Sequence, residues 1–140
     1  MKKMYSLKIL LPVILFIGAL FINFSLLTVQ DTEWVVPEEA KNMVNPVEID
    51  DDGLEIAEEL YTKHCKSCHG AEGLGDGTKA AELEASVGDF SAEAFQSQTD
   101  GALFYKTSEG RDDMPTFKKK ITEDEDRWLL VHYMRTLAEK

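Results

Sequence analysis

The stretch that decides the fold is Cys65-Lys66-Ser67-Cys68-His69, near the middle of a chain of 140 residues. It contains both cysteines of the chain, and a histidine follows the second cysteine directly. A small disulfide-stapled fold needs several spaced cysteines, so this pair does not form such a framework. The pattern instead predicts a local site at which two thiols and an imidazole hold one group.

This spacing is the attachment signature of a covalent haem c. Two thiols one short turn apart can add to the two vinyl groups of one porphyrin, and the next residue then presents its imidazole to the iron. The sequence therefore predicts thioethers from Cys65 and Cys68 and an axial bond from His69. A thiol redox pair and a zinc site are the alternatives. The first favours a βαβ context, which is not apparent, and the second needs about four ligands and would have to recruit His64 or His132.

The flanking sequence predicts an all-α domain over residues 50–140, because no strand-like alternation of useful length is present. Asp52 or a neighbouring aspartate can cap a helix whose apolar residues recur at three- and four-residue spacing until Cys65. The glycines of residues 70–77 predict a loop that wraps closely around a bulky group. Further helices are expected over residues 78–87, 92–96 and 99–109, and from a capping box of Thr122 and Glu125 onward.

Several features together resemble a class I cytochrome c domain. They are Leu60-Tyr61 before the signature, Gly73-Leu74-Gly75-Asp76-Gly77 after it, Gly110 with Met114-Pro115-Thr116-Phe117, and Trp128 with Tyr133 in the last helix. The likeness covers roughly residues 50–140. It implies a small helical bundle around one haem, whose first and last helices cross at Ala57. It also implies that Met114 is the second axial ligand.

Met114 lies in a charged loop just before Pro115, which is an unusual place for a methionine that only fills a core. A thioether opposite His69 would give a six-coordinate iron with a raised potential. Met43, Met134, His64 and His132 are expected not to be ligands, and His64 is expected to point away from the haem. Packing around the haem or at the helix crossing is expected of Tyr61, Phe117, Trp128 and Tyr133.

One departure from the family pattern concerns the ring of His69. Related domains often have a proline after the glycine loop, and its carbonyl accepts the proton of the second ring nitrogen. The prolines of this chain are residues 12, 37, 46 and 115, so none lies in that loop. A backbone carbonyl between Ala80 and Leu83 is the expected substitute.

Residues 1–30 predict an N-terminal membrane anchor. Ile9 to Gln30 contains no charged residue, and three lysines precede it. As a helix this segment extends about 33 Å, enough for a hydrocarbon core of about 30 Å. The lysines keep the amino terminus cytoplasmic and place the domain on the periplasmic side. A cleaved signal peptide is the alternative, and it too exports the domain, then free in the periplasm.

The rest of the chain is acidic: residues 31–140 hold 12 basic and 26 acidic residues, a formal net charge of −14. This charge excludes a nucleic-acid surface. It favours redox partners with a basic docking face, and the alternative is that it only keeps the domain soluble. Residues 31–49 contain Pro37 and Pro46 and lead into the acidic cluster Asp50 to Asp52, so they are expected to be an extracytoplasmic linker.

Together these features predict a single-electron carrier rather than an enzyme. It would relay electrons between respiratory-type redox proteins at the outer face of the cytoplasmic membrane, without a small-molecule substrate. One alternative is a haem c subunit of a fixed oxidoreductase complex, with residues 34–46 as an interaction segment. A haem enzyme or gas sensor with an open iron is less supported, because no distal His or Arg is positioned for it.

Overall fold

The computed structural model describes residues 33–139, and all regular elements within them are helical, as predicted. No helix of this part is long and apolar enough to cross a membrane, and the anchor predicted over residues 1–30 lies outside it. The long helices are α3 (Asp51–His64), α6 (Asp100–Glu109) and α7 (Asp124–Thr136). The short ones are α2 (Glu38–Lys41), α4 (Lys66–His69), α5 (Glu93–Gln96) and the 3-10 turns Ala80–Glu82 and Leu137–Glu139.

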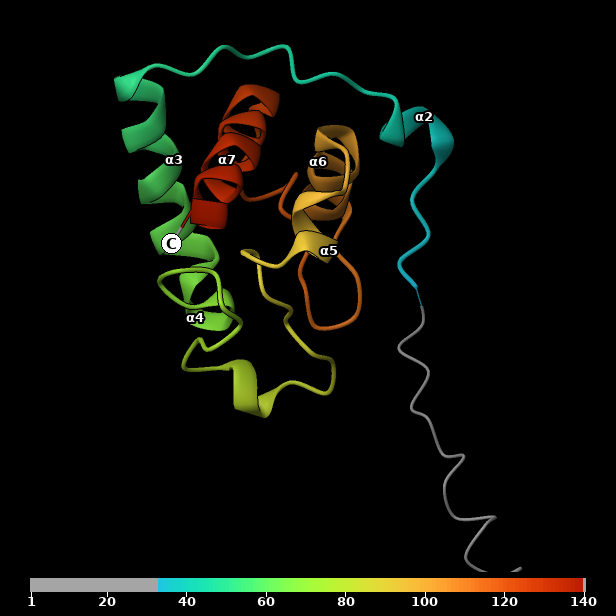
Figure 1. Cartoon of the computed structure of the whole chain (residues 1–140), viewed down its shortest axis with the longest axis vertical. Helices are drawn as coiled ribbons and strands as arrows, with labels where there is room; N and C mark the ends of the chain where they lie inside the picture. Colours follow the sequence, from blue (N-terminus) through green and yellow to red (C-terminus); the bar gives the residue numbers. More distant parts are fainter. Residues whose placement is uncertain (1–32, 140) are drawn as a thin grey trace, which may run out of the picture. The chain divides into compact units, whose positions relative to one another are not determined.

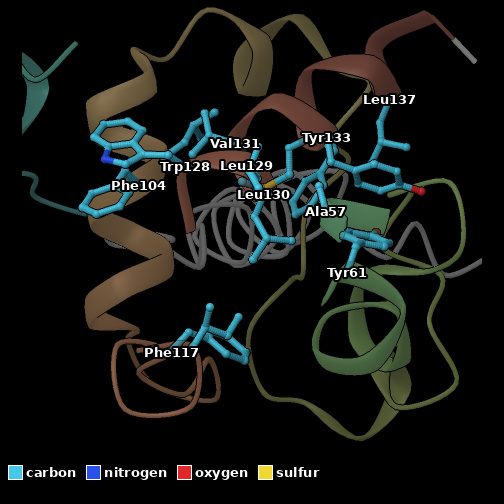
Figure 2. Packing of buried hydrophobic residues seen from close by; sticks show 14 residues of the cluster. Ala57, Tyr61, Phe104, Phe117, Trp128, Leu129, Leu130, Val131, Tyr133 and Leu137 are labelled. Atoms are coloured by element: carbon cyan, nitrogen blue, oxygen red, sulfur yellow. The ribbon is translucent and has the colours of Figure 1, made fainter. Parts of the chain in front are cut away.

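Helix α7 is the centre of the core, with α3 packed on one side and α6 on the other (Figure 1). Ala57 of α3 is fully buried, so the small residue expected at the crossing does lie in the contact region. Aromatic rings cover both sides of α7. Tyr133 lies against Tyr61 of α3 with ring centres 5.0 Å apart, and Trp128 stacks on Phe104 of α6 at 4.0 Å (Figure 2).

Helices α3 and α6 begin at side-chain caps. The Asp50 carboxylate accepts a hydrogen bond from the Gly53 amide at 2.8 Å, so a neighbour of Asp52 is the cap. The Thr99 hydroxyl accepts one from the Ala102 amide at 3.2 Å. Each bond satisfies an amide that has no partner within the first helical turn.

The capping box predicted for the last helix is wrong. Glu123 is the residue before α7, and no side chain caps the helix. Thr122 instead bonds the Glu123 carboxylate at 3.3 Å. The entry to α7 is held by the buried guanidinium of Arg127, which donates to the carbonyls of Ile121 and Thr122.

The helix predicted over residues 78–87 is also wrong, since only the 3-10 turn Ala80–Glu82 forms there. Its amides are drawn to distant partners instead. Lys79 N–H donates to the Ser67 carbonyl at 2.8 Å, and Glu84 N–H donates to the Asp113 carboxylate at 3.1 Å. Long-range bonds of this kind override a weakly periodic helical sequence.

Residues 34–48, which we call the N-terminal strap, pack on the domain rather than leaving it. Val36 and Ala40 are buried against Ala102 of α6. Gly101 permits this approach, because a Cβ atom there would lie 2.0 Å from the Ala40 carbonyl oxygen. The described part of the predicted linker, residues 31–49, thus includes a helix seated on α6.

After α2 the N-terminal strap continues past α7 to the start of α3 (Figure 1). Two hydrogen bonds fix it to α7. The Asn45 side-chain amide donates to the Trp128 carbonyl at 3.3 Å, and His132 Nε2 lies 2.8 Å from the Val47 carbonyl oxygen. His132 therefore has a structural partner of its own.

Candidate haem site

A cavity of about 250 Å³ brings the four predicted site residues together: Cys65, Cys68, His69 and Met114 all line it. Cys65 to His69 come from the α3–α4 junction, whereas Met114 comes from the loop after α6. Most other lining side chains are apolar, among them Leu83, Val87, Phe90, Phe95 and Leu103. Sulfur and imidazole groups thus meet in a mainly apolar chamber, which suits a large flat hydrophobic group.

The three groups of the signature lie within one helical turn. Cys65 ends α3 with its amide bonded to the Tyr61 carbonyl at 2.8 Å. The Cys65 carbonyl then accepts from the amides of Cys68 and His69 at 3.1 and 3.0 Å. The turn brings the two thiols near each other and places the imidazole directly after them, as the attachment signature requires.

The glycine loop holds this turn by backbone contacts. The amides of Gly77 and Gly75 donate to the carbonyls of Cys68 and His69 at 3.2 and 2.9 Å. A Cβ atom at Gly77 would lie 2.4 Å from the Cys68 carbonyl carbon, so only glycine fits there. The loop predicted to wrap around a bulky group therefore wraps closely around α4.

The loop of residues 110–117, which we call the Met114 loop, is a tight turn fixed to α6. Arg111 and Met114 exchange two backbone hydrogen bonds of 2.9 Å. Asp112 completes the turn with a φ of 51°, a left-handed conformation that aspartate tolerates better than most residues. Beyond Met114, the Thr116 hydroxyl donates to the Ser108 carbonyl at 2.7 Å.

The imidazole of His69 is in the form that binds metals. Burial lowers its pKa from 6.5 to about 4, so the ring is neutral at physiological pH. It packs on Phe90 with ring centres 4.4 Å apart. Among residues 33–139, its Nδ1 is the one buried side-chain nitrogen or oxygen without a hydrogen-bond partner. The carbonyl expected between Ala80 and Leu83 therefore does not receive this proton.

The two alternatives to haem find little support in the site. Burial, with a smaller effect of Cys68, raises the pKa of the Cys65 thiol to about 12, whereas a redox cysteine needs a lowered pKa to supply thiolate. Cys65 and Cys68 form no disulfide with each other. Within the described residues, no group of three or more His, Cys, Asp or Glu side chains could hold a metal ion such as zinc.

Some lining residues were not expected from the sequence. His64 was predicted to point away, but it lies in the lining with its ring edge-on to Phe117 at 6.0 Å. Met134, predicted not to be a ligand, is also part of the wall. Trp34 of the N-terminal strap lines the cavity as well, and its only signal in the sequence was an isolated tryptophan beside two valines.

The fold is a small all-α domain, and the spacing of Cys65 and Cys68 is consistent with a covalently attached haem c. The family model for cytochrome c matches residues 54–138. The chain therefore belongs to the cytochrome c family, which confirms the resemblance seen in its sequence. Members of this family are typically electron carriers, and membership implies electron transfer through haem c.

Among solved structures, the chain is similar to one from the reducing HAO-like protein complex of Kuenenia stuttgartiensis. The two are 26% identical with a TM-score of 0.60, and the likeness covers 78% of this chain and 52% of that one. This chain thus spans about half the length of the structure it matches. No curated protein matches it.

Proposed function

We propose that the chain carries one haem c, bound through Cys65 and Cys68, with His69 and Met114 as its axial ligands. In this proposal it passes single electrons between redox proteins outside the cytoplasm. The observation that supports this most is that all four side chains line the same cavity, although Met114 is 45 residues beyond His69 in the sequence.

The side chains have separate tasks in this scheme. Cys65 and Cys68 would hold the group covalently through their sulfur atoms. Bound there, haem would supply a one-electron iron couple. The neutral ring of His69 and the thioether of Met114 would both bind the iron, which would leave no position for a substrate. The apolar wall, with Phe90 and Leu103, limits the entry of water.

We propose further that residues 9–30 anchor the domain at the outer face of the cytoplasmic membrane. The uncharged length of that segment and the lysines before it support this. The formal charge of −14 over residues 31–140 supports redox partners with a basic docking face, because opposite charges speed encounter.

The test is expression of the full chain in a host that attaches haem c, followed by spectroscopy in detergent. We expect haem that stays with the polypeptide after denaturation, and loses this property in a Cys65→Ala, Cys68→Ala double variant. The oxidised protein should show the far-red sulfur-to-iron band of a methionine ligand. Met114→Leu should lose the band, and Met134→Leu, the matched control in the same wall, should keep it. A high-spin wild type that binds carbon monoxide without denaturant would refute electron transfer through a closed site.

A second candidate is a haem c subunit of a fixed oxidoreductase complex. The similarity to a chain of a multi-protein complex favours it. Mild detergent extraction from the native membrane, followed by size-exclusion chromatography, separates the two. A constant ratio to one oxidoreductase through the whole peak supports the fixed subunit, and elution as a single species without partner supports the mobile carrier.

A further inference from the structure

We propose that Trp34 is a positioning residue for the Met114 loop, and that the N-terminal strap keeps Met114 on the iron. This inference rests on the proposed His69 and Met114 ligation. It concerns a segment outside the region that matches the family, residues 54–138, so it is a property of this chain rather than of the matched domain.

Trp34 contacts the Met114 loop through a cation. The guanidinium carbon of Arg111 lies 4.8 Å from the centre of the Trp34 ring, and Lys106 Nζ lies 5.5 Å from it. Both cations, Trp34 and Met114 belong to the lining of the same cavity. Cations held over an indole face are attracted by its electron-rich surface, and the attraction grows when water is partly excluded.

Arg111 connects this contact to the proposed ligand. Its backbone N–H and C=O are the groups that pair with Met114, each at 2.9 Å. A displacement of Arg111 therefore also shifts one end of the turn that presents the Met114 thioether. Two short contacts, one through a side chain and one through the backbone, join Trp34 to Met114.

The N-terminal strap holds Trp34 in place. Two residues along the chain, Val36 is buried against Ala102, and Ala40 follows it into the same cluster. Trp34 and Tyr105 pack at the edge of this cluster. The position of Trp34 is therefore fixed by the seat of α2 on α6, and Gly101 sets how close that seat can be.

Loss of the Trp34 ring should make Met114 easier to displace from the iron. The measurement is a titration of the oxidised full-length haem protein with imidazole, followed by loss of the far-red sulfur-to-iron band. We expect Trp34→Ala to bind imidazole roughly three- to thirtyfold more tightly than wild type, the range set by the strength of one cation–π contact. The control is Val35→Ala, because Val35 is 82% exposed and should leave the affinity unchanged.

Two more variants separate this role from general destabilisation. Trp34→Phe keeps a ring, though a weaker one for cations, and should fall between wild type and Trp34→Ala. Gly101→Ala leaves Trp34 intact but displaces α2, since its Cβ would clash with the Ala40 carbonyl. It should raise imidazole affinity in the same direction, and it should expose the N-terminal strap to limited proteolysis.

The outcomes distinguish the positioning role of Trp34 from the proposed ligation by Met114. Equal imidazole affinity in wild type, Trp34→Ala and Gly101→Ala, with the band present in all three, overturns the positioning role and leaves the proposed ligation standing. A wild type without the band, with a spectrum equal to that of Met114→Leu, overturns the proposed ligation itself. A graded increase from wild type through Trp34→Phe to Trp34→Ala supports the inference.

Discussion

The contact of α3 with α7 and the contact of the N-terminal strap with α6 are built in different ways. The first joins two long helices through large buried side chains such as Tyr61 and Tyr133, whose ring centres lie 5.0 Å apart. The second joins a single helical turn to α6 through small residues, Val36, Ala40 and Ala102. Burial of apolar surface contributes about 25 cal/mol per Å², so the first contact contributes far more to stability.

This difference separates the stability of the fold from the shape of the haem site. The α3–α7 contact fixes the attachment turn, because Cys65 directly follows α3. The strap contact borders the Met114 loop through Trp34 and Arg111. Regions held by less buried surface open locally, with a free energy smaller than that of global unfolding. The side of the cavity next to Met114 is therefore expected to open first.

The largest effect is expected from a cavity in the α3–α7 contact. Leu129→Ala should lower the free energy of unfolding by about 2–5 kcal/mol, because Leu129 is buried in the main cluster and its Cδ2 lies against Gly53 of α3. Urea denaturation followed by circular dichroism measures this. Leu74→Ala is the control, since Leu74 is 43% exposed and its loss should change little. Equal midpoints for the two variants would show that this contact does not dominate stability.

A smaller effect is expected in the strap contact. Val36→Ala should cost about 1–2 kcal/mol of local stability, because Val36 is buried but belongs to a small cluster. Amide hydrogen exchange should speed up in α2 and at the start of α6 and stay unchanged in α3 and α7. Val44→Ala, at a position 84% exposed, is the control. Faster exchange throughout the domain would mean that the two contacts open together.

Tyr61 tests a polar element of the α3–α7 side. Its buried hydroxyl donates to the Gly70 carbonyl at 2.8 Å, so Tyr61→Phe should cost about 0.5–1.5 kcal/mol at neutral pH. Burial raises the pKa of Tyr61 above its usual 10.0. The unfolded chain therefore loses this proton first, and stability should fall as the pH rises above 10. About four urea titrations between pH 8 and pH 11 measure this. The urea midpoint should fall less with pH in Tyr61→Phe than in wild type. An equal pH dependence in the two proteins would show that the Tyr61 hydroxyl does not contribute to it.

The smallest effect is expected at an exposed ion pair between the end of α6 and the residue after the Met114 loop. Lys118 Nζ lies 2.6 Å from a Glu109 carboxylate oxygen, and both side chains are at least 40% exposed. Lys118→Met should change stability by less than about 1 kcal/mol, because water screens such pairs. Thermal unfolding at low and high salt measures this. A loss as large as that of Val36→Ala would show that the ion pair, rather than buried surface, holds the Met114 loop on α6.

The attachment site could be predicted from sequence because its chemistry is local. Cys65, Cys68 and His69 lie within one turn, so their spacing in the sequence sets their spacing in the structure. Met114 was singled out by the resemblance to class I cytochrome c domains and by its place before Pro115 in a charged loop, and it lines the same cavity as Cys65, Cys68 and His69. The all-α fold followed from helical periodicity, and family membership confirms it.

The errors came from contacts between distant residues. The packing of the N-terminal strap was not visible either, because Val36 and Ala40 precede their partner Ala102 by more than 60 positions and give no periodic signal. Residues 78–87 have enough helical character for a helix, but the Ser67 carbonyl and the Asp113 carboxylate bind their amides. The predicted capping box at Thr122 does not form. The buried guanidinium of Arg127 binds the carbonyls before α7 instead. None of these partners can be identified from local sequence.

The packing of α2 on α6 also bears on the order in which parts of the chain can fold. The ribosome makes the N-terminal strap before the domain, yet the surface that receives it, Gly101 and Ala102, is made about 60 residues later. Closure of so long a loop costs conformational entropy, so contacts of this kind are expected to form late in folding. Cys65, Cys68 and His69 are synthesised before α6, and Met114 is synthesised after it. The wall beside Met114 is therefore expected to close last, which would leave that side open for the haem to enter.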